Sequence, residues 1–144
     1  MREALREILL AALLAGAAVG AAASKAASDE WEMLLKRDIA RVDLNVSSIE
    51  RGANGGIQAY VLTMYSEPKT TPDGATYKNS TQVIEWDCAS QRSWLHGVAY
   101  EMKSKLVGLR KYPNAEASSF MPPETLGGAT ERAACAYFRR KGLL

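Results

Sequence analysis

The sequence has few of the residue types that build metal, cofactor and nucleotide sites. Its 144 residues include one histidine and two cysteines, which are too few ligands for a zinc finger or an iron–sulfur cluster. Gly52, Gly55 and Gly56 have the spacing of a turn, and we expect no helix opening with Lys-Ser or Lys-Thr directly after them, so they are not a phosphate-binding loop. We therefore expect neither a cofactor nor a metal ion.

An excess of charge of one sign is also missing. The chain has 18 Lys+Arg against 16 Asp+Glu, a net charge of +2, whereas a dedicated nucleic-acid-binding domain concentrates basic residues on one face. Hydrophobic residues make up 47% and charged residues 24%, proportions that are typical of a globular domain. We expect one domain preceded by a leader, with no nucleic acid as partner.

The longest apolar run is too short to span a membrane as a helix. Ile8–Val19 is about twelve residues long, against the ~20 that a bilayer requires. It follows a charged start and precedes the small residues Ala21–Ala23, the pattern that a signal peptidase recognises. We expect residues 1–23 to be a cleaved signal peptide and 24–29 a short linker, with an uncleaved amphipathic helix as the alternative. No cysteine follows the run to accept a lipid, so we expect no stable membrane anchor after cleavage.

Export changes the interpretation of the two cysteines. In an oxidising compartment Cys88 and Cys135 most simply form one disulfide. By the chain-entropy relation, a loop of this size stabilises the folded state by about 4 kcal/mol. The alternative is a free catalytic thiol paired with His96, for which the sequence shows no third, orienting group.

The pattern of residues 30–141 predicts one domain of short strands followed by a helix. Ile57–Tyr65 is apolar on both faces, which is typical of a central strand that is covered twice. Asn54-Gly55 is a strong hairpin signal, and the prolines and glycine of Ser66–Gly74 predict a surface loop. The expected strands, by residue number, are 31–36, 40–43, 57–65, 76–88, 92–101 and 106–112.

The C-terminal helix is expected to start near Pro123–Thr125, or after the helix-weakening pair Gly127–Gly128, and to end around Arg140 with Gly142 as the stop. Two apolar stripes compete to face the sheet. If Cys135 forms the disulfide, the side of the helix on which it lies must face inward. At about 100° per residue, that side also carries Ala134 and Phe138. The competing stripe contains Leu126, Ala129, Ala133 and Tyr137.

A series of short motifs carries a family resemblance. These motifs are, in order, Trp31, Asp43, Ser47-Ser48-Ile49, Tyr65, Glu67-Pro68-Lys69, Tyr77, Glu85-Trp86-Asp87-Cys88, Arg92, Ala99-Tyr100 and Cys135. Their order resembles the bacterial surface-adhesin protein E family over about residues 30–137.

The resemblance implies an α+β fold, in which a single antiparallel sheet of about six strands carries the C-terminal helix on one face. It implies that the Cys88–Cys135 bond ties the helix to the sheet. It also implies a non-catalytic protein that is similar to an outer-membrane adhesin for laminin and vitronectin. From the leader we expect the protein to be exported, to the periplasm or the extracellular space. In that adhesin a basic pair after the loop proline takes part in binding; here Lys69 matches the first position and Thr70 occupies the second. We expect a ligand-binding loop with Lys69, Thr70 and Lys78.

His96 and three carboxylates are the remaining candidates for chemistry. We interpret His96 as a structural histidine on a strand face shared with Trp94, Val98 and Tyr100, because no partner is identifiable. Two of the three carboxylates would resemble a glycosidase pair only if they met in a cleft, and nothing in the sequence brings them together. They are Asp43, Glu85 and Asp87.

The basic and aromatic residues have both a structural and a binding interpretation. The basic ones form a solvated surface that discourages edge pairing, or an electrostatic contact with an acidic macromolecule. They are Lys69, Lys78, Lys103, Lys105, Arg110 and Lys111. The aromatic ones pack in the core or anchor an interface; they are Tyr60, Tyr77, Tyr100, Tyr112 and Trp94.

Two functions follow from these patterns. The first is an adhesin-like binding domain, a monomer or homodimer, whose partner is a matrix or serum glycoprotein. The alternative is a structural or partner-binding protein of the bacterial cell envelope with no host ligand, as the departure at Thr70 suggests.

Overall fold

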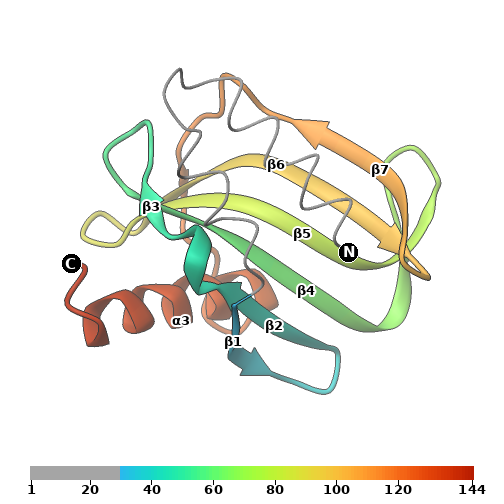
Figure 1. Cartoon of the computed structure of the whole chain (residues 1–144), viewed down its shortest axis with the longest axis horizontal. Helices are drawn as coiled ribbons and strands as arrows, with labels where there is room; N and C mark the ends of the chain where they lie inside the picture. The colour runs from blue at the N-terminus through green and yellow to red at the C-terminus, as the bar shows by residue number, and fades with distance from the viewer. Residues whose placement is uncertain (1–29) are drawn as a thin grey trace.

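A single antiparallel sheet carries one helix, α3 (Leu126–Arg140), on one face (Figure 1). The computed structural model describes residues 30–144, so the expected signal peptide and linker lie outside the described residues. The strand order β1-β2-β4-β5-β6-β7 gives the six expected strands, and two two-residue strands add to them, β3 beside β4 and β8 beside β6. The bounds are β1 (Trp31–Lys36), β2 (Ala40–Asn45), β3 (Glu50–Arg51), β4 (Ile57–Thr70), β5 (Thr76–Asp87), β6 (Arg92–Met102), β7 (Lys105–Lys111) and β8 (Ser118–Ser119), with a 3-10 turn at Val46–Ser48.

The strand β4 is central, as its apolar pattern predicts. It pairs with β2 and β3 on one side and with β5 on the other. Ala59 and Val61 pack in the cluster beneath α3, while Tyr60 packs with Val83 and Ala99 on the opposite face. All of these side chains are buried, because alternation along a central strand sends apolar groups into both layers.

The connection between β4 and β5 differs from the prediction. Ser66–Gly74 was expected to be a surface loop, but β4 continues to Thr70 and only residues 71–75 form the turn. A register shift between Met64 and Lys69 absorbs Pro68, which has no N–H for the ladder. A bulge therefore accommodates turn-forming residues within the strand, and the prediction was wrong for residues 66–70.

The helix begins at the first of the two predicted positions. Thr125 is its N-cap and accepts a hydrogen bond from the Gly128 amide at 3.0 Å, a capping contact typical of threonine. A Cβ on Gly128 would collide with the Pro122 carbonyl oxygen, which explains why the first helical turn contains this glycine. Gly142 has φ +70 just beyond the end of the helix and stops it as predicted.

The side of α3 that faces the sheet is the one on which Cys135 lies. Ala134 and Phe138 are fully buried, and Phe138 contacts Trp86 of β5 with ring centroids 5.4 Å apart. Tyr137, from the competing stripe, is buried as well and packs edge-on against Phe138. The helix thus buries a wider face than one stripe because β1 packs against it in addition to the central strands.

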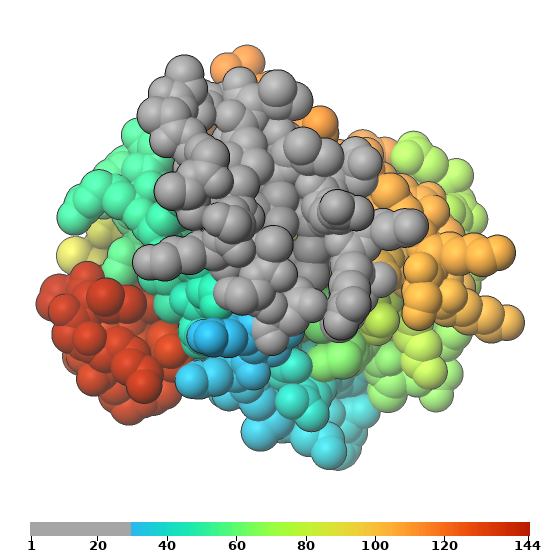
Figure 2. All heavy atoms as spheres, viewed as in Figure 1, coloured from blue at the N-terminus to red at the C-terminus, as the bar shows by residue number. Residues whose placement is uncertain are grey.

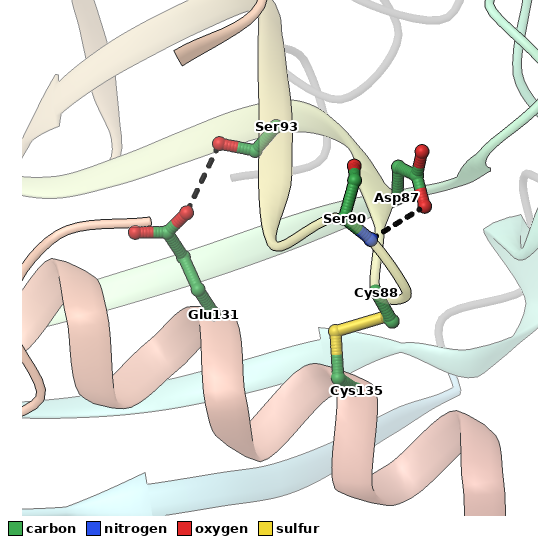
Figure 3. The surroundings of a disulfide bond; sticks show 6 residues. All are labelled: Asp87, Cys88, Ser90, Ser93, Glu131 and Cys135. Atoms are coloured by element: carbon green, nitrogen blue, oxygen red, sulfur yellow. Dashed lines mark hydrogen bonds between the residues drawn. A yellow bond between two sulfur atoms is a disulfide. The ribbon is translucent and has the colours of Figure 1, made fainter. Parts of the chain in front are cut away.

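The predicted disulfide closes this arrangement. Cys88, directly after β5, is bonded to Cys135 on α3, and their Cα atoms are 5.7 Å apart (Figure 3). A second link lies along the same helix, where Glu131 accepts hydrogen bonds from the Ser93 hydroxyl and the Met121 amide, each at 3.0 Å. The helix is therefore tied covalently to β5 and by a carboxylate to β6.

Candidate functional site

The three residues of the expected ligand-binding loop lie on strands. Lys69 is paired with Tyr77 and Thr70 with Thr76 where β4 and β5 approach their turn, and Lys78 follows on β5. The side chains of Lys69, Thr70 and Lys78 are exposed. The structure places all three near one end of the sheet, on two neighbouring strands rather than in a loop.

Three tyrosines from neighbouring strands meet beside Lys69. The ring of Tyr77 lies edge-on to Tyr65 of β4, with centroids 6.0 Å apart, and is tilted against Tyr100 of β6 at 4.6 Å. The Lys69 ammonium lies 5.3 Å from the centre of the Tyr65 ring, within the range of a cation–π contact. We call Tyr65, Tyr77 and Tyr100 the tyrosine row; each is partly exposed.

The β4–β5 turn and β7 border the tyrosine row. Arg110 of β7 forms an ion pair with Asp73 of the turn at 2.8 Å. Tyr100 pairs with Gly108 on β7, where a Cβ would come within 3.3 Å of the tyrosine ring. Partial burial is the largest cause that raises the pKa of all three tyrosines of the row, so they remain neutral phenols near pH 7.

Cations outnumber exposed carboxylates at this end of the molecule, which we call the tyrosine end. The exposed carboxylates at the ends of β4 to β7 around the row are Glu67 and Asp73, while Glu101 of β6 is buried. Figure 2 shows that residues 70–78 and 102–106 form the surface farthest from α3. The cations in the same segments are Lys69, Lys78, Lys103, Lys105 and Arg110.

A buried carboxylate lies near the other end of the sheet. Glu85 of β5 is 0% exposed and accepts hydrogen bonds from the Asn54 amide at 3.0 Å, the Gly56 amide at 2.8 Å and the Asn54 side chain at 3.0 Å. A Cβ on Gly52 would collide with the Glu85 carboxyl group, so the turn approaches this closely because position 52 is glycine. The predicted Asn54-Gly55 hairpin is confirmed, with Gly55 at φ +83.

His96 makes the fourth hydrogen bond to Glu85, with Nε2 2.9 Å from Oε1. Burial is the largest influence on Glu85 and raises its pKa, but the hydrogen bonds from His96, Gly56 and Asn54 together outweigh burial and lower it. Glu85 is therefore held as a carboxylate that fastens the 52–56 turn to β5 and β6.

The predicted surroundings of His96 were wrong. The β5–β6 register shifts between Val83 and Ile84, which leaves His96 as an extra residue on β6. Trp94 pairs with Glu85 and Val98 with Gln82, positions of opposite parity on β5, so Trp94 and Val98 lie on opposite faces. One inserted residue reverses the alternation, and it is what aims His96 at Glu85.

The other two candidate carboxylates have separate local partners. Asp43 accepts a hydrogen bond from Arg41 Nε at 2.8 Å. Asp87 accepts one from the Ser90 amide at 3.2 Å, and hydrogen bonding to Ser90 is the main cause that lowers its pKa (Figure 3). Each of the three carboxylates therefore accepts hydrogen bonds from a different set of neighbours.

An open groove lies at the edge of β6, between β7 and β8. It has a volume of about 450 Å³ and runs along the segment Lys111–Glu116, with Leu95 and Ser118 on its other sides. The Tyr112 amide donates to the His96 carbonyl oxygen at 2.9 Å, which fixes one end of the segment. Within residues 30–144 no group of three or more His, Cys, Asp or Glu could hold a metal ion, and no helix is long and apolar enough to cross a membrane.

Comparison with known proteins gives one match. The sequence model of a family described as surface-adhesin protein E matches residues 31–136, which includes every strand and most of α3. Neither the curated proteins nor the solved structures contain a match.

Proposed function

Because the chain belongs to the surface-adhesin protein E family, we propose that it is an exported binding domain that holds a matrix or serum glycoprotein at its tyrosine end. Membership indicates an adhesin-like, non-enzymatic protein at an exported or surface location. The identity of the partner and the residues that bind it are the parts that we add.

One observation carries the proposal: exposed cations and partly exposed aromatic rings occur together at the end of the sheet that α3 leaves uncovered. Tyrosine and arginine are among the side chains that most often anchor protein interfaces, and the lysines add electrostatic attraction. Lys69, which matches the first residue of the basic pair in the adhesin described above, contacts the tyrosine row directly. Because Lys69 is placed there, we expect electrostatic attraction to an acidic glycoprotein to contribute to binding and to weaken as salt is added.

The test is retention of the purified exported protein on immobilised laminin and vitronectin across a salt series. We expect Lys69→Glu to weaken retention roughly tenfold at low salt, because the change replaces an attraction by a repulsion. Lys141→Glu is the matched control, since it makes the same change in net charge at the far end of α3. Equal retention of both variants would show that the tyrosine end does not bind these glycoproteins.

The departure at Thr70, where the adhesin described above has the second residue of its basic pair, favours one other function. A domain with half of the basic pair would serve as a partner-binding protein of the cell envelope. This function predicts no retention on either glycoprotein, together with one specific envelope protein recovered in a cross-linked pull-down from the producing cells.

Export is a proposal of its own. We propose that residues 1–23 are removed during secretion. Cell fractionation followed by mass measurement, with and without reductant, tests this. The expected mature chain begins near Ser24 and gains two hydrogens on reduction, whereas an intact N-terminus in the cytosolic fraction would contradict export.

A further inference from the structure

We propose that the tyrosine row is the floor of a saccharide site that takes an acidic oligosaccharide. This inference rests on the proposed function and names the part of the glycoprotein that the tyrosine end recognises. The anionic groups of the sugar would pair with Lys69 and with the lysines around it.

The position of the row shows that it is not part of the packed interior. Tyr65, Tyr77 and Tyr100 belong to neither of the two apolar clusters, and each remains partly exposed. Tyr65 lies eight residues along β4 from Ile57, which packs at the helix-covered end, a distance of roughly 25 Å. Such a row leaves aromatic surface in contact with water, which is unfavourable, and a bound ligand would cover that surface.

Sugar rings suit such a floor because of their own polarity. Their C–H faces carry partial positive charge and attract the negative face of an aromatic ring. The hydroxyl groups of the three tyrosines can donate and accept hydrogen bonds at the rim, and their raised pKa keeps them protonated. Apolar faces edged by polar groups are what a pyranose chain presents.

The charge around the row selects an acidic sugar over a neutral one. Lys69 is held over Tyr65 by a cation–π contact, and it is exposed, so its ammonium group is open to solvent. Arg110 is bound to Asp73, which itself is exposed and can yield the guanidinium to a competing anion. Lys78, Lys103 and Lys105 add further positive potential at the same end.

The experiment compares three polymers that separate the two parts of this chemistry. Hyaluronan oligosaccharides have sugar rings and carboxylates, dextran has sugar rings without charge, and polyglutamate has carboxylates without sugar. We expect binding in the order hyaluronan, then polyglutamate, then dextran. Polyglutamate binding as tightly as hyaluronan, or binding to anionic lipid vesicles without binding to hyaluronan, would overturn the saccharide site.

Variants at Tyr77 test the stacking itself. We expect Tyr77→Ala to weaken hyaluronan binding about five- to tenfold, and Tyr77→Phe to retain most of it, because phenylalanine keeps the ring face. Thermal melting of both variants separates lost stacking from lost folding. If Tyr77→Ala stays folded and binds hyaluronan like the unchanged protein, the row is not the floor of the site.

The failure of this inference is distinguishable from the failure of the proposed function. Laminin is presented before and after enzymatic removal of its glycans. Equal retention on both forms would overturn the saccharide site and leave glycoprotein binding in place. Absence of retention on intact laminin and vitronectin, with hyaluronan still bound, would overturn the proposed glycoprotein partner instead.

Discussion

The two ends of the sheet differ in how far their side chains are buried. At one end α3, the disulfide and the 52–56 turn cover β4 and β5, and the side chains there are buried, with Trp86 1% and Phe138 0% exposed. At the other end the helix is absent, and Tyr65, Tyr77 and Tyr100 close the sheet with only partial burial. The helix therefore covers one end of the sheet and leaves the end at the β4–β5 turn open (Figure 1).

The physical cause is that one covered end is enough to hold a sheet of this length. Apolar burial and a covalent link there restrict the strands, and hydrogen bonding along the ladder carries the order outward to the tyrosine end. The exposed end can then present aromatic and basic side chains without supporting the fold. Substitutions at the two ends should therefore differ in size and in what they affect.

Removal of the disulfide should cause the largest loss of unfolding free energy, at the end of the sheet that α3 covers. We expect the double variant Cys88→Ser and Cys135→Ser to lose about 4 kcal/mol of unfolding free energy, because 47 positions separate the two residues and the unfolded chain gains that loop's freedom. Urea unfolding with and without reductant measures it. The reduced unchanged protein is the control and should match the variant; a loss below about 1 kcal/mol would show that packing alone holds α3.

The buried carboxylate comes next. Glu85→Gln should cost about 2–3 kcal/mol, because glutamine turns an NH₂ group toward the donors of the 52–56 turn and His96. Glu50→Gln on β3 is the matched control, since Glu50 is exposed, and should change stability by less than about 0.5 kcal/mol. Equal effects of the two changes would mean that the turn is held by its backbone alone.

The pH dependence of stability tests the same carboxylate, Glu85. Folding lowers the pKa of Glu85, so its contribution to stability is complete above the pKa of an unfolded glutamate, about 4.3, and is lost as the pH falls toward the lower folded value. Unfolding free energy between about pH 5 and pH 3 should therefore fall more steeply in the unchanged protein than in Glu85→Gln. Parallel curves would contradict the assignment.

The start of α3 offers a matched pair of glycines. Gly128→Ala should lose about 2 kcal/mol, because the new Cβ meets the Pro122 backbone carbonyl, which cannot move aside cheaply. Gly127→Ala meets the sulfur of Met121 at 2.5 Å, and this side chain is 51% exposed and flexible, so it can yield. The second variant should be neutral or slightly stabilised by the higher helix propensity of alanine; thermal melts of the pair decide the point.

Apart from the matched controls, the smallest loss of stability is expected at the tyrosine end. Tyr77→Ala should cost about 1 kcal/mol in unfolding free energy, the size of its two ring contacts. A loss of 3 kcal/mol or more in urea unfolding would show that the row supports the fold, and the contrast between the two ends would disappear.

Much of the fold could be predicted from local patterns. Alternation located β4 at the centre, Asn54-Gly55 located a hairpin, and Thr125 and Gly142 mark the limits of α3. These signals depend on residues near one another in the chain, and they need no knowledge of the partner strand.

The errors share one cause. The extension of β4 past Tyr65 and the reversed face of Trp94 both follow from bulges, where one strand contains more residues than its neighbour. A bulge is a property of a pair of strands, so no window of a single strand reveals it. The partner of His96 was missed for the same reason, because Glu85 reaches it only after the register shifts.

The periodicities, the turn and cap residues, and the two cysteines that an oxidising compartment would join can all be recognised without the fold. The contacts of Glu85 with His96 and the 52–56 turn, and those of three tyrosines beside Lys69, arise only when the strands pair. The reason is physical: periodicity and capping are local free-energy preferences of a short segment, whereas a site made of side chains from three strands exists only once their register has been set.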